Sequence, residues 1–184
     1  MNNIVHLKGK ILYIYETPKN HHLVLKIGCG SNVVSCFATN EKVKMHLKEF
    51  SLGNYINISG NIQSSRRYDK DGESIICTQI VFIDSIIPPD YTDKGCFYNR
   101  FWLNGTVSEI REHKNCLKIT VRTDNEGRIS FIPVTFYYPD IRLLNFEVGE
   151  KIATQGSIQS VRKVNKDGEY KYFQNYVGSQ DKTG

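Results

Sequence analysis

The feature that most constrains the fold of this 184-residue chain is an internal repeat at an offset of 96 positions. The phrase GNIQSSRRYDKDGE (60–73) returns as GSIQSVRKVNKDGE (156–169), and LKGKI (7–11) returns as LNGTV (103–107). Because separate blocks share one offset, the sequence predicts two tandem copies of one structural unit.

Two further segments of the unit also recur. SLGNYINISGNIQS (51–64) matches EVGEKIATQGSIQS (147–160) at the same offset. LVLKI (23–27) corresponds to LKITV (117–121) with a slip of two positions, which we interpret as a loop that changes length. The repeat therefore covers a whole folding unit and not a single motif.

A break in the periodicity separates the two copies. IIPPDYTDKGCFYN (86–99) holds paired prolines, a glycine and mixed polar residues, a composition typical of linkers. The sequence therefore predicts a first domain over 1–86, a linker over 87–99 and a second domain over 100–184.

Within each copy, apolar residues alternate with the period of two that is typical of strands. The predicted strands are 4–15, 23–29, 33–37, 55–67 and 75–83 in the first copy and 101–110, 117–122, 129–136, 151–163 and 170–177 in the second. Between the third and fourth strands, helical spacing predicts a helix after Asn40 that ends before Gly53, and a second helix opened by Pro139. This order predicts an all-β protein of two tandem OB-folds, five-stranded Greek-key barrels with one helix each.

Composition excludes several classes of protein. With 40% hydrophobic residues and no long apolar run, no membrane span is expected, and the N-terminal segment (1–10) lacks the pattern of a secretory signal. These features predict a cytoplasmic protein without membrane partners. The five cysteines are odd in number and form no CxxC pair, so we expect reduced, mostly packed thiols, no zinc site and no cofactor. The net charge of +5 permits a polyanionic partner.

The first copy resembles one family specifically. FSLGNYINISGNIQSSRRYDKDGESIICTQIVFIDSI (50–86) is similar to the signature of bacterial single-stranded DNA-binding proteins, with a basic hairpin tipped by Asp-Gly and a Thr-Gln pair at Thr78 and Gln79. VVSCFATNEKVKMHL (33–47) and VHLKGKI (5–11) resemble the family's third strand with its helix and its first strand. The second copy keeps the first strand, the glycines and the hairpin but lacks the Thr-Gln pair.

The resemblance implies an OB-fold protein that binds single-stranded DNA without sequence preference and without catalysis. It also implies a homodimer, because members with two OB-folds per chain assemble into units of four folds. The family's acidic C-terminal tip, which recruits replication and repair enzymes, has no counterpart in the last residues, GSQDKTG (178–184), so the identity of such partners is left open. At the hairpin position where the family commonly has a stacking aromatic, the two copies carry Arg67 and Lys163.

Binding a single strand without sequence preference needs cations along the backbone and exposed aromatic faces for the bases. The candidate binding residues of the first copy are Lys8, Lys10, Lys26, Phe37, Tyr55, Arg66, Arg67, Tyr68 and Lys70. Those of the second copy are Trp102, Arg122, Tyr137, Arg162, Lys163, Lys166, Tyr170 and Tyr172. Such a site should lose affinity steeply as salt is added.

Each candidate also has a purely structural interpretation. Strict alternation places Tyr13 and Tyr15 on the core side unless a bulge intervenes, and Phe37 fits either the core or the outer face. Trp102 fits a barrel end or the junction between the domains. The cations of the hairpins stand beside aspartates, and charged hairpins are often only solvated.

The sequence offers no catalytic signal. His21 and His22 are adjacent in a predicted loop and are expected to be surface residues, and no nucleophile elbow, phosphate loop or HExxH motif occurs. We therefore expect a protein that is not an enzyme.

The sequence favours single-stranded DNA binding and protection in replication, recombination or repair. A bacterial, phage or mobile-element origin and association with the nucleoid are the corresponding expectations. Two alternatives stay open. One is an interaction or scaffolding module of a replication or conjugation assembly. The other is an RNA-binding OB-fold protein, because the fold alone does not determine whether DNA or RNA is bound.

Overall fold

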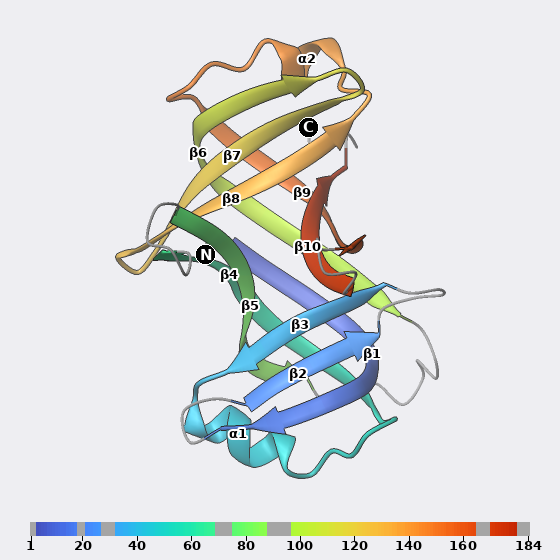
Figure 1. Ribbon diagram of the computed structural model, residues 1–184. Helices are drawn as coiled ribbons and strands as arrows, with labels where there is room; N and C mark the ends of the chain where they lie inside the picture. The colour runs from blue at the N-terminus through green and yellow to red at the C-terminus, as the bar shows by residue number, and fades with distance from the viewer. Residues whose placement is uncertain are drawn as a thin grey trace.

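The computed structural model describes residues 3–17, 21–26, 32–68, 75–87, 97–164 and 170–179. Within them, the structure describes the side chains except at 66–68, 75–77, 162, 163 and 170–172. Figure 1 shows two barrels, one above the other, with strands that cross from each toward its neighbour. No helix of this part of the chain is long and apolar enough to cross a membrane.

Barrel 1 is built from the first half of the chain. Its elements are β1 (Asn3–Glu16), β2 (His21–Lys26), β3 (Val33–Ala38), α1 (Glu41–Leu47), β4 (Tyr55–Tyr68) and β5 (Ile75–Ile87). The strands pair in the order β2-β3-β5-β4-β1, and β1 closes the barrel on β2.

Barrel 2 repeats this topology. Its elements are β6 (Tyr98–His113), β7 (Cys116–Asn125), β8 (Arg128–Tyr137), α2 (Ile141–Leu144), β9 (Lys151–Val164) and β10 (Tyr170–Gly178). The strands pair in the order β6-β7-β8-β10-β9, and β9 closes on β6. The all-β fold class with OB barrels is therefore confirmed, and the strands run a few residues beyond several of the predicted bounds.

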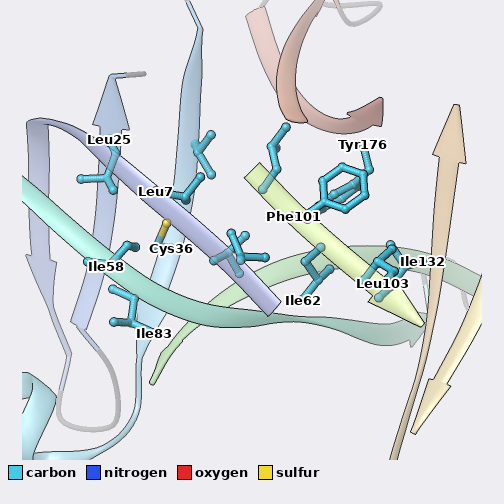
Figure 2. Packing of buried hydrophobic residues seen from close by; sticks show 14 of the residues in the cluster. Leu7, Leu25, Cys36, Ile58, Ile62, Ile83, Phe101, Leu103, Ile132 and Tyr176 are labelled. Atoms are coloured by element: carbon cyan, nitrogen blue, oxygen red, sulfur yellow. The ribbon is translucent and has the colours of Figure 1, made fainter. Parts of the chain in front are cut away.

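Alternation along the strands fills the core of both barrels. On β1, Val5, Leu7 and Ile11 are buried, whereas the side chains between them face outward. Figure 2 shows Leu7 with its barrel 1 neighbours and Phe101 beside Tyr176 in barrel 2. Burial of aliphatic and aromatic side chains on the inner face of each barrel is the main stabilising term of such a fold.

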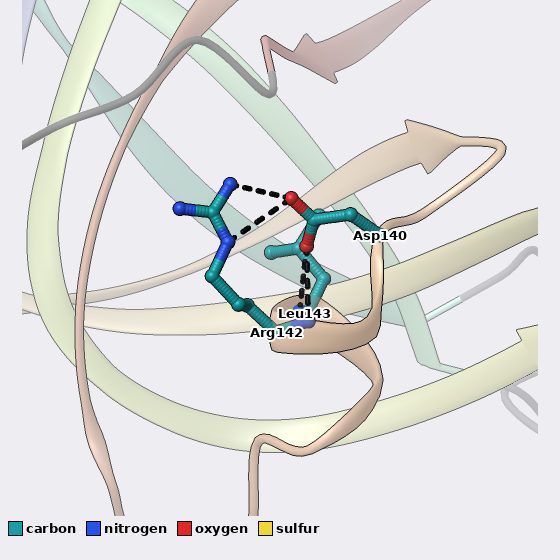
Figure 3. A network of polar contacts seen from close by, with 3 residues as sticks. All are labelled: Asp140, Arg142 and Leu143. Atoms are coloured by element: carbon teal, nitrogen blue, oxygen red, sulfur yellow. Dashed lines mark hydrogen bonds and ion pairs between the residues drawn. The ribbon is translucent and has the colours of Figure 1, made fainter.

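Side-chain caps begin both helices. The Asn40 side chain accepts a hydrogen bond from the Lys42 backbone N–H at 2.9 Å, as predicted. In barrel 2, the cap is Asp140, whose carboxylate accepts from the backbone N–H groups of Arg142 and Leu143 and pairs with the Arg142 guanidinium (Figure 3). The prediction that Pro139 opens this helix is therefore wrong by two residues, because Pro139 precedes the cap.

A bulge in β1 overturns the prediction for two tyrosines. The register slips between Ile11 and Tyr13, so that Leu12 is an extra residue in the strand. The extra residue reverses the alternation, because successive side chains point to opposite faces. Tyr13 and Tyr15 are consequently 49% and 52% exposed instead of lying on the core side.

The structure also corrects the loop assignments in the first copy. His21 and His22 belong to β2, and His21 is buried with its Nε2 3.2 Å from a Glu16 carboxylate oxygen.

The run 23–26 corresponds to 119–122 at the full offset of 96, because Leu25 pairs with Ile11 as Val121 pairs with Val107. The slip of two positions falls after this strand, in the connection to the third strand of the barrel.

The two barrels are joined by antiparallel pairing of β1 with β6. Val5 pairs with Phe101, which is its own counterpart in the repeat, and Asn3 pairs with Leu103 as Leu7 pairs with Asn99. This exchange is the signature of an isologous contact, the kind that joins the subunits of a two-fold dimer. The chain therefore contains within itself a pseudo-two-fold axis at the Val5–Phe101 pair.

Two asparagines at equivalent positions on β1 and β6 bond to the neighbouring strand of their own barrel. The Asn99 amide donates to the Ile158 carbonyl at 2.7 Å, and its oxygen accepts from the Ile158 N–H at 2.9 Å. Asn3 makes the same pair of bonds with the backbone of Ile62. Each side-chain amide thus bonds both the N–H and the carbonyl of one residue on the neighbouring strand, as a paired backbone residue would.

The repeated phrase begins at Gly60 on β4 and at Gly156 on β9, and we call these two segments the arms. Each arm crosses from its own barrel to the other. Ser64 on β4 exchanges hydrogen bonds with Ser130 and Phe131 at the start of β8. In the symmetric contact, Ser160 on β9 bonds with Asn32 and Val33 at the start of β3. The base of each arm is therefore part of the contact between the barrels.

The glycine that begins each arm is required by close packing. A Cβ on Gly60 would clash with the Phe82 carbonyl oxygen, and a Cβ on Gly156 would clash with the Val177 carbonyl oxygen. The repeat of these glycines in the sequence therefore has a steric cause.

Removal of the Asn99 amide should weaken the contact of β6 with β9 in barrel 2. We expect Asn99→Ala to lower the free energy of unfolding by about 1 to 3 kcal/mol, because two backbone groups of Ile158 lose a partner. Asn104→Ala, at an exposed position of the same strand, is the matched control and should change stability little. Urea unfolding of the two variants measures the difference, and equal midpoints would contradict this role of Asn99.

Candidate nucleic-acid interface

An aromatic row crosses the outer face of barrel 1. Tyr15 pairs with His22, His22 with Phe37, and Phe37 with Phe82, so the row lies in register on four neighbouring strands, β1, β2, β3 and β5. Tyr15 is exposed, and the other three side chains are half-buried. We call these four side chains the aromatic row.

The rings of the row lie close together. The His22 and Phe37 rings are stacked, with centroids 4.4 Å apart and an interplanar angle of 4°, and the Phe37 and Phe82 centroids are 6.3 Å apart. The Arg128 guanidinium, from the other barrel, lies over the Phe82 ring at 5.7 Å. Flat rings with a cation at one end form a surface that nucleic-acid bases can stack on.

Charge and protonation differ along the row. Burial lowers the pKa of His22, which keeps the imidazole neutral at pH 7 and suited to stacking. At the other end, partial desolvation raises the pKa of the Asp84 carboxyl, hydrogen bonds from Asn61 oppose the rise, and the Glu126 carboxylate adds to it. Asp84, two residues after Phe82, and Arg128 therefore place groups of opposite charge at the Phe82 end of the row.

Barrel 2 lacks this row. The positions equivalent to the aromatic row are Arg111, Lys118, Thr135 and Val177, which pair in the same register. A groove of about 580 Å³ lies on this face between β6, β7, β8 and Gln79 of the crossing β5. The Arg111 guanidinium is 2.6 Å from a Glu109 carboxylate oxygen, so part of the positive charge of the groove is compensated.

The predicted site residues divide among several surfaces. Phe37 and Lys26 lie on the outer face of barrel 1, and Lys26 pairs with Lys10 across β1 and β2. Lys8 and Trp102 lie on the paired strands β1 and β6 at the junction of the barrels, and Lys10 pairs with Tyr55 of β4 inside barrel 1. The structure therefore brings together two groups of candidates and not one.

The remaining candidates belong to barrel 2 and to the arms. Arg122 is exposed at the position of β7 equivalent to Lys26, and Tyr137 is exposed at the end of β8, far along the strand from the arms. For Arg66, Arg67, Tyr68, Arg162, Lys163, Tyr170 and Tyr172 the structure gives the strand position and pairing but no side-chain placement. Lys70 and Lys166 lie outside the described residues.

The sequence reasoning missed three members of the row and its cation. The bulge at Leu12 reverses the face predicted for Tyr15, and the sequence predicts a loop at His22, which lies in β2. Arg128 carries no local signal, because its place over Phe82 depends on the contact between the barrels. The alternation of 75–87 does put Phe82 on the outer face, a signal that could have found it.

One residue of the family-like signature also has a counterpart in barrel 2. Gln79 pairs with Ser64 as Gln174 pairs with Ser160, so Gln174 is the structural equivalent of Gln79. Gln174 donates to the Ser35 carbonyl at 2.8 Å, across the junction. The second copy therefore keeps the glutamine of the Thr-Gln pair and has Phe173 in place of the threonine.

The fold matches known structures. Wild-type single-stranded DNA-binding protein from Thermus aquaticus superposes with a TM-score of 0.70 at 16% identity, over 97% of this chain and 90% of that one. A deletion mutant of the same protein gives a TM-score of 0.71 at 15% identity, over 97% and 92%. At this identity the likeness establishes a shared OB-type fold over nearly the whole chain.

Comparison of sequences adds no relative. No protein-family model matches the chain, and no curated protein sequence matches it.

The lowered pKa of His22 predicts a dependence of stability on pH. A group that binds protons less readily when folded contributes stability above its ordinary pKa of 6.5 and loses it as the pH falls through its folded pKa. We expect the melting temperature of the wild type to fall in this acidic range, and His22→Gln to make the fall smaller. Melting curves from pH 5 to pH 8 give the test, with His46→Gln on α1 as control; an unchanged profile for His22→Gln would rule out this titration.

Proposed function

We propose that this protein binds single-stranded DNA without sequence preference, with the bases on the aromatic row of barrel 1. The observation that carries the proposal is the register of the row, which places aromatic side chains on four neighbouring strands. Strands lie about 4.8 Å apart, so the row spans about 14 Å, enough for several bases in succession. Stacking uses the flat face that every base has and so tolerates any sequence.

The geometry favours an unpaired strand over a duplex. In a duplex the flat faces of the bases are covered by their neighbours, and a row of rings on a sheet cannot reach them. Arg128 lies over the Phe82 ring, and Lys26 lies on β2 four residues beyond His22. Both would neutralise phosphates of a strand whose bases are splayed onto the rings. The fold shared with the Thermus aquaticus protein supports the same conclusion.

The two barrels would then have different roles. Barrel 2 has Arg111, Lys118, Thr135 and Val177 where barrel 1 has aromatic side chains, so its face cannot stack bases in the same way. We infer that barrel 1 supplies most of the affinity for bases. Barrel 2 contributes cations or, as a second candidate supported by its polar groove, a contact with a protein partner.

The cellular role we propose is protection of exposed single strands during replication, recombination or repair, by a homodimer with four barrels. The support is the family resemblance of the sequence together with the shared fold. The native mass of the protein, alone and with oligo-dT, measures the assembly directly.

Loss of the central ring should weaken binding strongly. We expect Phe37→Ala to reduce the affinity for oligo-dT by about five- to 150-fold, because a base stack contributes about 1 to 3 kcal/mol. Phe37→Tyr keeps a flat ring and should keep most of the affinity. Fluorescence anisotropy with labelled oligo-dT at fixed salt measures both.

Thr135→Ala is the matched control for this experiment, since Thr135 occupies the same position in barrel 2. Its affinity should stay within about twofold of the wild type, and melting curves exclude misfolding as the cause of any loss. Equal affinities of Phe37→Ala and Thr135→Ala would remove the basis of the proposal.

The arms provide a second test of the division of roles. We expect Arg66→Ala with Arg67→Ala to weaken oligo-dT binding and to reduce the slope of log affinity against log salt, because phosphate contacts release counterions. The equivalent change in barrel 2 is Arg162→Ala with Lys163→Ala. If that change leaves both affinity and slope unaltered, barrel 2 takes no part in DNA binding through its arm, and the protein-contact role gains support.

A further inference from the structure

The two ends of the molecule that carry the helices expose apolar side chains. We call residues 39–54, which contain α1, the α1 end, and residues 137–150, which contain α2, the α2 end. They lie at opposite extremes of the molecule, with α2 at the top and α1 at the bottom of Figure 1. Neither end contains a residue of the aromatic row or of the paired strands β1 and β6.

The helix of the α2 end covers its barrel less fully than α1 does. α1 has seven residues and buries Val43 and Leu47 against the core, whereas α2 has four residues, none of which is buried. Leu143 and Phe146 reach the core of barrel 2 only in part. The exposed large apolar side chains of the α2 end are Tyr137, Tyr138, Ile141, Leu144 and Val148. A cluster of this kind marks an interaction surface.

An insertion before α2 enlarges this surface. In barrel 1, one residue separates Ala38 from the cap Asn40. In barrel 2, three residues separate Phe136, the equivalent of Ala38, from the cap Asp140. One of the three is Tyr138, which has a φ of 50° in the left-handed region and is 77% exposed. Barrel 1 closes without the extra residues, so the strained and exposed ring is not a requirement of the fold.

The α1 end offers apolar side chains in return. Met45 and Leu52 are 60% and 64% exposed. Methionine adapts its shape to a partner surface, and aromatic and methionine side chains are enriched in protein interfaces. The two ends can therefore bury apolar surface against each other.

The charges of the two ends have opposite signs. The α1 end carries three lysines and two carboxylates, a net charge of +1, and the α2 end carries three carboxylates and one arginine, a net charge of −2. Ion pairs within each end compensate one lysine of the α1 end and the arginine of the α2 end. The exposed groups outside these pairs include Lys42 and Lys48 at the α1 end and Glu147 and Glu150 at the α2 end.

These charges select one pairing of ends among three. Two α2 ends would bring carboxylates together, and two α1 ends would bring ammonium groups together, which is unfavourable in an interface. An α2 end against an α1 end brings opposite charges together around the apolar side chains.

We propose that the α2 end of one copy docks on the α1 end of the next copy, so that proteins bound to the same single strand form a head-to-tail row. A contact between two different surfaces leaves one free end at each extreme, and the row can therefore extend. The inference rests on the proposed function, because the bound strand holds neighbouring copies at a high effective concentration. A contact too weak to join free molecules can then form between neighbours on DNA.

The experiment uses the full chain and two lengths of oligo-dT. The short strand is the longest one to which native mass spectrometry finds a single unit of the protein bound, and the long strand is several times longer. We expect the wild type to bind each site of the long strand at least about tenfold more tightly than the short strand, because neighbours add the contact between ends. We call this ratio of affinities the long-strand advantage.

Charge reversal tests the pairing of the ends. Glu147→Lys with Glu150→Lys makes both ends positive, and Lys42→Glu with Lys48→Glu makes both ends negative. Each pair of changes should reduce the long-strand advantage to about twofold or less, and all four changes together should restore most of it, because the ends again have opposite signs. The advantage is a ratio for one variant, so a general effect of charge on DNA binding cancels.

A second variant tests the apolar part of the contact without a change of charge. Ile141→Ser with Val148→Ser should also reduce the long-strand advantage. The matched control is Ile129→Ser, because Ile129 is an exposed apolar residue at the other end of β8 from the α2 end. Melting curves check the fold of each variant, including the turn in which the Glu150 carboxylate accepts from the Glu147 N–H at 2.8 Å.

Three results would overturn the inference. The first is equal affinity of the wild type for each site of the two strands, which would leave the exposed ends to a different partner. The second is a long-strand advantage that survives either charge reversal or that the four changes together do not restore. The third is a changed native mass of the free protein in these variants, which would make the ends part of the homodimer contact. Failure of the proposed function looks different, because then neither oligo-dT binds to the wild type.

Discussion

The pairing of β1 with β6 is the interaction on which the rest of the structure depends. It places Val5 against its own counterpart Phe101 and so builds inside one chain the contact that a two-fold dimer would make between two. Once this ladder forms, both barrels belong to one continuous sheet of ten strands. The arms then extend from each barrel onto the start of the third strand of the other.

The covalent link between the copies removes the constraint that both faces of the contact be identical. In a homodimer, a change at one position appears on both sides of the axis, whereas here each copy varies alone. Phe37 has become the centre of an aromatic row in barrel 1, while the equivalent Thr135 bonds to the Asn175 side chain at 3.1 Å. The pseudosymmetric fold thus carries the aromatic row on one barrel and a polar groove on the other.

The core and topology could be predicted from the sequence because they follow from local alternation and from the repeat. Val5, Leu7 and Ile11 alternate on one face of a strand, and no partner strand needs to be known to place them inside. The repeated glycines and the capping residue Asn40 likewise have local causes, namely close packing and the unpaired N–H groups of a helix end.

The candidate site could be predicted only in part because it depends on register. A single extra residue, Leu12, turns Tyr13 and Tyr15 outward, and the alternation up to Ile11 does not predict this bulge. Arg128 reaches Phe82 from the other barrel, so its role follows from the junction.

The central claim is that bases, and not only phosphates, hold the strand on barrel 1. The most direct measurement compares the affinity of the wild type for oligo-dT with its affinity for an abasic strand of the same length at the same salt concentration. With several bases stacked at about 1 to 3 kcal/mol each, the account predicts at least tenfold tighter binding of oligo-dT, with similar salt slopes for the two strands. Equal affinities would contradict it, because they would show that the protein holds the strand by charge alone.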